Sequence, residues 1–279
     1  MTLTTSGESR LGRSFVVLAP PQEAGRSFDH MVDDPIRHDH LLAEVQRLRG
    51  MVYLADGAIQ TSDLSLDGRH VQAVDDVSWH LLTVDSHGSV TAGIRYLAHR
   101  PGVTYSDLGI SRSIADQTAT FKSQVRRAVQ SELERAALAD FSYVELGGWV
   151  VSEELRCSTE AIRMLLMMYA LSQSLGGALA LSTATARHSS SAMLRRSGGR
   201  SMVEGGVEVP SYYDPHYNCE MEVLAFDSRF PNPRYTGWIR EFSEALHYIP
   251  MISAGPASTT SSLLRLHSEV ADCPVLLAQ

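Results

Sequence analysis

Apolar residues in the first half of the chain recur at two different periods. Between Leu41 and Val52 they lie three or four residues apart on one face, which predicts a helix from Ile36 to a stop at Gly57. Two β-rich runs follow, and Asp-Ser-His-Gly between them has the composition of a turn, so we expect a hairpin of strands 79–84 and 90–98. A second amphipathic helix is predicted over 121–139.

The second half of the chain alternates between strand and helix. A strand over 143–151 contains adjacent glycines at 147 and 148, which favour a bulge or a close backbone approach. The next helix, 158–174, is apolar on nearly all sides, so we expect it to be buried against a sheet. Further predicted elements are strands at 178–184, 201–209 and 219–226 and a helix at 189–196. This order predicts a mixed α/β sheet.

The two ends of the chain show weaker patterns. Residues 1–35 contain one strand-like run, 15–19, followed by two prolines and polar residues, and are expected to form a loosely packed N-terminal arm. Residues 228–279, with a helical stretch at 239–247 before Ser/Thr-rich turns, are expected to be a C-terminal extension. The main domain is therefore predicted to span 36–227.

Composition excludes several classes of protein. The 279 residues are 44% apolar and 20% charged, which excludes a disordered tail or a collagen-like fibre. A formal net charge of −8 argues against general nucleic-acid binding. Three scattered cysteines indicate neither a disulfide framework nor a metal clip. The longest apolar run, Met164–Leu171, is well short of the roughly 20 residues of a transmembrane helix. We therefore expect a cytoplasmic protein.

A basic region marks the first candidate for chemistry. Span 161–203 has no Asp or Glu but contains five arginines: Arg163, Arg187, Arg195, Arg196 and Arg200. It follows a predicted helix start at Ser158-Thr159, where unpaired N–H groups favour phosphate. The region indicates a phosphate-bearing or acidic partner. The alternative, that carboxylates from elsewhere pair with these arginines, is equally open.

Several motifs occur in an order that resembles a known family. Arg156-Cys-Ser-Thr-Glu-Ala161, between the glycine-containing strand and the buried helix, is similar to the acyl-donor motif Arg/Gln-x-x-Gly-x-Gly/Ala of the GCN5-related N-acetyltransferases (GNAT). The other matching segments are Arg49–Gly57, Asp75–Leu82, Ala92–Arg95, Glu145–Val151, Met193–Gly199 and Tyr213–Glu222. Together they resemble the acyl-homoserine-lactone-synthase-like and N-acyl amino acid synthase branch. The resemblance implies a GNAT fold, with a mixed, mostly antiparallel central sheet flanked by helices and a bulged fourth strand.

The resemblance also implies roles for individual residues. Glu145 is the implied general base, and we expect burial to raise its pKa. The implied donor-binding residues are Gly148, Trp149, Val150, Val151, Arg156, Ser158, Thr159, Ala161 and Arg195. Arg95 and Asp75 are the implied acceptor-binding residues, because a carboxylate-bearing acceptor needs a cation. The Met-rich stretch 164–168 could line an acyl tunnel.

Each of these roles has a plainer alternative. Glu145 could pair with an arginine in the sheet, Arg95 could belong to a structural ion pair, and Asp75 could belong to a turn. The methionines could be ordinary core. No metal site is predicted, because His38 and His40 are two residues apart and diverge on a helix. Cys157 is not needed as a nucleophile when the amine attacks the thioester directly.

The function implied is N-acyl transfer, with a long acyl group moving from acyl carrier protein or acyl-CoA to the amine of a small acceptor such as an amino acid. Thr159 stands where the family usually has glycine, and its side chain should hinder a tight wrap around a pyrophosphate. This favours acyl carrier protein over coenzyme A. The acceptor-pocket residues of the lactone synthases are not matched, so S-adenosylmethionine is not supported as acceptor. No tightly bound cofactor is expected, and a homodimer is left open. The alternatives are an acetyltransferase that uses acetyl-CoA and a non-catalytic module that binds acyl donors.

Overall fold

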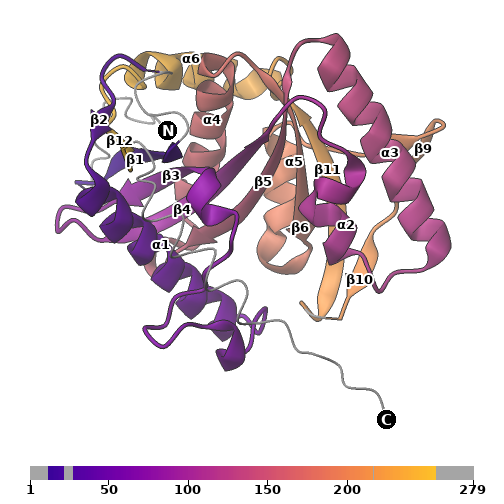
Figure 1. Cartoon of the computed structure of the whole chain (residues 1–279), viewed down its shortest axis with the longest axis horizontal. Coiled ribbons are helices and arrows are strands. Elements are labelled where there is room, and N and C mark those ends of the chain that lie inside the picture. The colour runs from indigo at the N-terminus through magenta and orange to yellow at the C-terminus, as the bar shows by residue number, and fades with distance from the viewer. Residues whose placement is uncertain (1–11, 22–27, 216, 256–279) are drawn as a thin grey trace.

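The structure is a computed structural model that describes residues 12–21, 28–215 and 217–255, without the side chain of His188. Its centre is a ten-stranded sheet with the order β10-β11-β6-β5-β4-β3-β1-β12-β2, and β7 also pairs with β11 (Figure 1). The strands are β1 (Ser14–Ala19), β2 (Val32–Asp33), β3 (Trp79–Val84), β4 (Val90–His99), β5 (Ser142–Val151), β6 (Ala178–Thr185), β7 (Arg200–Ser201), β10 (Tyr212–Asp214), β11 (Cys219–Asp227) and β12 (Met251–Ser253). The pairs β5·β6, β1·β12 and β12·β2 are parallel and the others antiparallel, which confirms a mixed, mostly antiparallel sheet.

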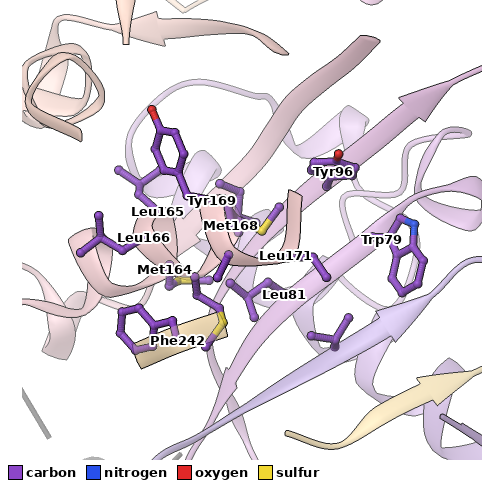
Figure 2. Packing of buried hydrophobic residues seen from close by; sticks show 14 of the residues in the cluster. Trp79, Leu81, Tyr96, Met164, Leu165, Leu166, Met168, Tyr169, Leu171 and Phe242 are labelled. Atoms are coloured by element: carbon purple, nitrogen blue, oxygen red, sulfur yellow. The ribbon is translucent and has the colours of Figure 1, made fainter. Parts of the chain in front are cut away.

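Helices cover both faces of this sheet. Successive strand residues point to opposite faces, so Leu81 packs with α4 (Glu160–Ser174) and α6 (Thr236–Ala245), whereas Leu82 packs with α1 (Pro35–Ala55). Figure 2 shows the α4 side, where α4 residues from Met164 to Leu171 meet Trp79, Tyr96 and Phe242. α5 (Ser190–Ser197) contributes Leu194 to this same cluster.

The other face carries three helices. α1, at the left of Figure 1, packs against β1 and β3, and α3 (Ala119–Leu138), at the right, packs against β6 and β11. The short α2 (Gly109–Ser113) belongs to the α3 cluster. Short 3-10 helices occur at η2 (Thr61–Asp63), η3 (Asp75–Val77), η4 (Tyr105–Asp107), η5 (Glu153–Leu155), η6 (Arg187–Ser189) and η7 (Pro233–Tyr235).

Most of the predicted elements are confirmed, including the first helix, the hairpin, the buried helix and the bulged strand. The single strand predicted over 201–209 is wrong. Gly205 and Gly206 both have positive φ and turn the chain, so this segment forms β7 and a separate hairpin of β8 (Val203–Glu204) and β9 (Val207–Glu208).

The ends of the chain contribute to the core. The expectation of a loosely packed arm is wrong for β1, which is buried and pairs with β3 and β12. In the C-terminal segment, α6 confirms the predicted helix, and β12 lies between β1 and β2. The Ser/Thr-rich end of the predicted extension lies outside the described residues. Among the described helices, none is both long and apolar enough to cross a membrane.

Candidate functional site

The main cavity lies where β5 and β6 separate. These parallel strands pair only from Ser142–Glu145 to Ala178–Leu181 within the described chain. Beyond that point, residues 146–151 of β5 and 182–185 of β6 line opposite walls of a cavity of about 640 Å³. The backbone of β5 that faces β6 there is left without ladder partners on that strand, so it is able to bind a ligand by hydrogen bonds.

A bulge shapes the β5 wall of the cavity. Gly93 of β4 pairs with Val150 and Arg95 pairs with Gly147, so Gly148 and Trp149 together lie opposite the single residue Ile94. Gly148 has φ +59°, and a Cβ there would lie 2.9 Å from Nη1 of Arg49. The bulge that the glycine pair predicts is therefore present, with Gly148 in it and Gly147 directly before it.

The donor-binding residues implied by the resemblance mostly lie on this cavity. Gly148, Trp149, Val150, Val151, Arg156, Ser158 and Ala161 all line it. Thr159 and Arg195 do not belong to the lining: Thr159 precedes the first turn of α4, and Arg195 pairs with Glu222 at 2.7 Å. The binding roles themselves stay predictions.

The start of α4 is fixed to the sheet by a buried acidic residue that the sequence did not single out. The Thr83 hydroxyl donates to Oε1 of Glu160 at 2.6 Å, and Arg163 donates to Oε2 at 2.8 Å. Glu160 and Arg163 are both buried. These contacts hold the first turn of α4 at the edge of the cavity.

The basic region is largely neutralised within the chain. Besides the Arg163 pair with Glu160 and the Arg195 pair with Glu222, Arg200 binds Glu132 at 3.2 Å. For these arginines, the alternative that carboxylates from elsewhere pair with them is confirmed. Arg156 likewise binds both carboxylate oxygens of Asp56, each at 3.0 Å.

The two implied acceptor-binding residues meet in a buried network beside the bulge. Asp75, whose side chain is 0% exposed, accepts hydrogen bonds from Arg49 at 2.5 Å and from Arg95 at 2.7 Å. Burial opposes ionisation of this carboxyl, but the two arginines hold its pKa below the ordinary value. Neither Asp75 nor Arg95 lines the cavity, so the contacts favour a structural pair, and an acceptor-binding role stays a prediction.

Glu145 faces α2 rather than the cavity. Its carboxylate accepts hydrogen bonds from His99 Nε2 at 2.9 Å and from the backbone N–H groups of Gly109 and Ile110 at 3.1 and 3.2 Å. The expected rise in its pKa is wrong. Burial does act to raise the pKa, but these three donors outweigh burial and lower it. The role of Glu145 as general base stays a prediction.

The cavity residues that received no individual role from the sequence include Tyr53, Asp56 and Tyr217, and Arg187 was named only as part of the basic region. Tyr53 donates its hydroxyl to the Trp149 carbonyl at 3.1 Å and so fixes the bulge to the end of α1. Burial raises the pKa of Tyr53 and of Tyr217, so both stay protonated at neutral pH. Both tyrosines lie inside motifs that carry the family resemblance, and this was the signal in the sequence that could have marked them as cavity residues.

A second, smaller cavity lies in the core beneath the first. Its volume is about 30 Å³, and Leu146 lines both cavities. Met168 and Tyr169 of α4 contribute to its wall, whereas Met164 and Met167 are fully buried core residues. Leu146 therefore separates the main cavity from additional space in the core. In the described chain, no group of His, Cys, Asp and Glu is arranged to hold a metal ion.

Comparisons with known proteins bear on the fold. No family model matches the chain, and no curated protein matches its sequence. A solved structure of a CoA-dependent acyl-homoserine lactone synthase, BjaI, with SAM and isopentyl-CoA is similar at a TM-score of 0.52 and 11% identity, covering 91% of this chain and 100% of the other. The structure of the same synthase with MTA has a TM-score of 0.53 and 12% identity, with the same shares of the two chains covered. The structure of an N-acyl amino acid synthase, FeeM, from uncultured soil microbes has a TM-score of 0.46 and 12% identity, covering 78% of this chain and 91% of the other. The chain therefore has the GNAT-type acyltransferase fold that the resemblance implied.

Proposed function

We propose that this chain is an N-acyltransferase that moves an acyl group from a pantetheine thioester to the amine of a small acceptor. The observation that carries the proposal is the cavity between β5 and β6, where a bulged strand presents unpaired backbone to about 640 Å³ of space. The fold supports it, since the similar synthase structure contains isopentyl-CoA.

The cavity walls suit the two parts of such a donor. Between Gly147 and Val151, the backbone N–H and C=O groups of β5 that bind neither β4 nor Tyr53 could pair with the amides of a pantetheine arm, as an added strand would. At the mouth, Arg156 and Ser158 precede the N-terminus of α4, where a phosphate is favoured by the helix dipole and the free N–H groups. Acyl carrier protein is our preferred donor because of Thr159, and acyl-CoA is the alternative.

The chemistry needs a neutral amine and a stabilised oxyanion. The amine nitrogen attacks the thioester carbonyl, the C–N bond forms, and the C–S bond breaks with release of the pantetheine thiol. Backbone N–H groups of the bulge could donate to the oxygen that becomes negative in between. A base must take one proton from the amine. Glu145 stays our candidate because its carboxylate is ionised; since it faces α2 and not the cavity, it would act through water.

The test is amine-dependent transfer by the purified chain. Acyl carrier protein and coenzyme A, each loaded with acyl groups of two to sixteen carbons, are incubated with single amino acids and amines. Thiol release and intact-mass spectra of the products are followed. We expect N-acyl products whose masses identify the acceptor, with longer chains preferred over acetyl.

A matched pair of variants connects this activity to the cavity. Ala161→Trp fills the donor side of the cavity, whereas Ala137→Trp adds the same side chain at an exposed position of α3, away from the lining. We expect the first to abolish transfer and the second to retain it. Full activity in Ala161→Trp would contradict the proposed site. Donor binding without transfer to any amine would favour the binding module, and a strict preference for acetyl-CoA would favour the acetyltransferase.

A further inference from the structure

Arg187 is a cavity-lining arginine held by backbone carbonyls. Its Nη1 donates to the carbonyl of Asp56, and its Nη2 donates to the carbonyls of Tyr217 and Asn218 at 3.1 and 3.0 Å. In the described part of the chain, Arg187 forms no ion pair with a carboxylate. Carbonyl dipoles hold a guanidinium in place but do not neutralise its full charge. This wall of the cavity therefore keeps a positive charge.

The segments that Arg187 contacts carry carboxylates, but these carboxylates have other partners or point away from the cavity. The Asp56 carboxylate binds Arg156, and Asp214 accepts from the backbone N–H of Tyr217. Glu220 lies between the cavity-lining residues 219 and 221 on β11, so strand alternation points its side chain away from the cavity.

Three arginines lie around Tyr217. Arg49 and Arg95 act on its hydroxyl and share the carboxylate of Asp75, whereas Arg187 binds its carbonyl and has no carboxylate partner in the described part of the chain. The hydroxyls of Tyr53 and Tyr217 stay protonated and add neutral donors to the same part of the cavity. The surroundings therefore favour an anionic ligand group.

The bonding of Arg187 distinguishes it from the arginine of the predicted donor loop. Its guanidinium joins the C-terminal end of α1 to the connection between β10 and β11. Arg156 of the donor loop meets the same residue of that end, Asp56, but pairs with its carboxylate, whereas Arg187 binds only its carbonyl. A guanidinium has five N–H groups, and three bonds to carbonyls leave two for a ligand.

We propose that Arg187 is the residue that binds the carboxylate of an amino-acid acceptor and thereby favours amino acids over simple amines. This inference rests on the proposed function and deepens it. The carboxylate held at Arg187 would leave the amine of the same molecule free to reach the thioester in the cavity. Arg187 then acts as a specificity-determining residue for the acceptor.

The experiment compares acceptors that differ only in the carboxylate. Amino acids are tested beside their decarboxylated amines, for example phenylalanine beside 2-phenylethylamine, with acyl carrier protein or CoA donors that the chain accepts. We expect the KM of the wild-type protein to be about 10- to 100-fold lower for the amino acid, the effect of a charged hydrogen bond. Arg187→Gln should remove this difference by raising the KM for the amino acid, with little change for the amine.

Two further variants distinguish a loss of carboxylate binding from a loss of the fold. Arg187→Lys retains the charge without the planar fork, so we expect an intermediate KM and a fold that is preserved even if Arg187→Gln is unstable. Arg196→Gln changes an exposed arginine outside the cavity lining and should behave as wild type. Circular dichroism checks that each variant is folded.

Other results would overturn the assignment. Equal KM values for amino acids and their amines in the wild-type protein would show that no carboxylate is recognised. A raised KM for the donor in Arg187→Gln, with the acceptor KM unchanged, would assign Arg187 to a donor phosphate instead. If the wild-type protein acylates no amine, the proposed function fails first, and this inference fails with it.

Discussion

Replacing Asp75 by asparagine should destabilise the protein strongly. The change removes a carboxylate that lies between two arginines, Arg49 at 1% side-chain exposure and Arg95 at 13%. Arg49 then keeps a buried charge that no longer has its partner. Breaking a buried pair from one side typically costs about 3–5 kcal/mol. We expect the unfolding free energy to fall by that amount at pH 7, measured by urea denaturation with tryptophan fluorescence.

Asp67→Asn is the matched control for this prediction. Asp67 also forms ion pairs with two arginines, Arg47 at 3.3 Å and Arg69 at 2.8 Å, but its side chain is 44% exposed. Water replaces the lost partner at such a site, so the change in unfolding free energy should be far smaller than for Asp75. Equal destabilisation by the two substitutions would refute the argument that burial sets the cost.

The pH dependence gives a second test of the same network. Because the pKa of Asp75 lies below its ordinary value of 3.8 in the folded state, the ionised carboxyl stabilises the fold at neutral pH. That contribution is fully present above the unfolded pKa and is lost as the pH falls through the range below about 4. The difference in unfolding free energy between wild type and Asp75→Asn should therefore shrink on acidification. A difference that stays constant down to pH 3 would contradict this.

Three further substitutions address the cavity. Gly148→Ala should lower the unfolding free energy by about 1–3 kcal/mol, because its φ is positive and the new Cβ meets Arg49, and it should reduce transfer. Gly205→Ala has a similar φ of +57° but open space around it, so comparing the thermal unfolding of the two variants separates the backbone strain from the contact. Leu146→Ala should join the two cavities. In a series of acyl chain lengths, we expect kcat/KM to shift roughly tenfold in favour of chains two methylenes longer, because each buried methylene contributes about 0.8 kcal/mol. An unchanged chain-length preference would show that the second cavity is not used. Glu145→Gln should lower kcat about 100-fold or more with unchanged donor affinity; an unaltered kcat would leave Glu145 as an anchor for α2.

The fold could be predicted where local pattern and burial coincide. The helix α4 is apolar on almost every side because it packs between the sheet and α6, and the sequence shows this directly. The short strands β2, β10 and β12 have two or three residues each, too few to show a period. β12 acquires its pairing from β1, which is more than two hundred residues away in the chain, so no local signal places it.

The candidate site was predicted in part for a similar reason. The bulge and the start of α4 are each formed by residues close together in the sequence, so the glycines of the bulge and the serine before the helix are enough to predict them. The ion partners are not local: Arg156 meets Asp56, which is one hundred residues distant, and Asp75 meets Arg95 across twenty. The resemblance could name Arg95 and Asp75 as a pair of interest, but only tertiary packing shows that they bind one another.

The buried network and the open cavity are two parts of one arrangement. A sheet strand gains free energy by pairing on both sides, so β5 and β6 would be expected to continue their ladder beyond Glu145. Their pairing ends there, and just beyond this point β5 bulges at Gly148 and Trp149. Its glycines pack against two guanidinium groups: an added Cβ would lie 3.3 Å from Nη2 of Arg95 at Gly147 and 2.9 Å from Nη1 of Arg49 at Gly148. Asp75 holds both guanidinium groups from the far side. Asp75 therefore fixes the two side chains against which this part of β5 packs, so a substitution that relaxes the network should also change the shape of the β5 wall of the cavity.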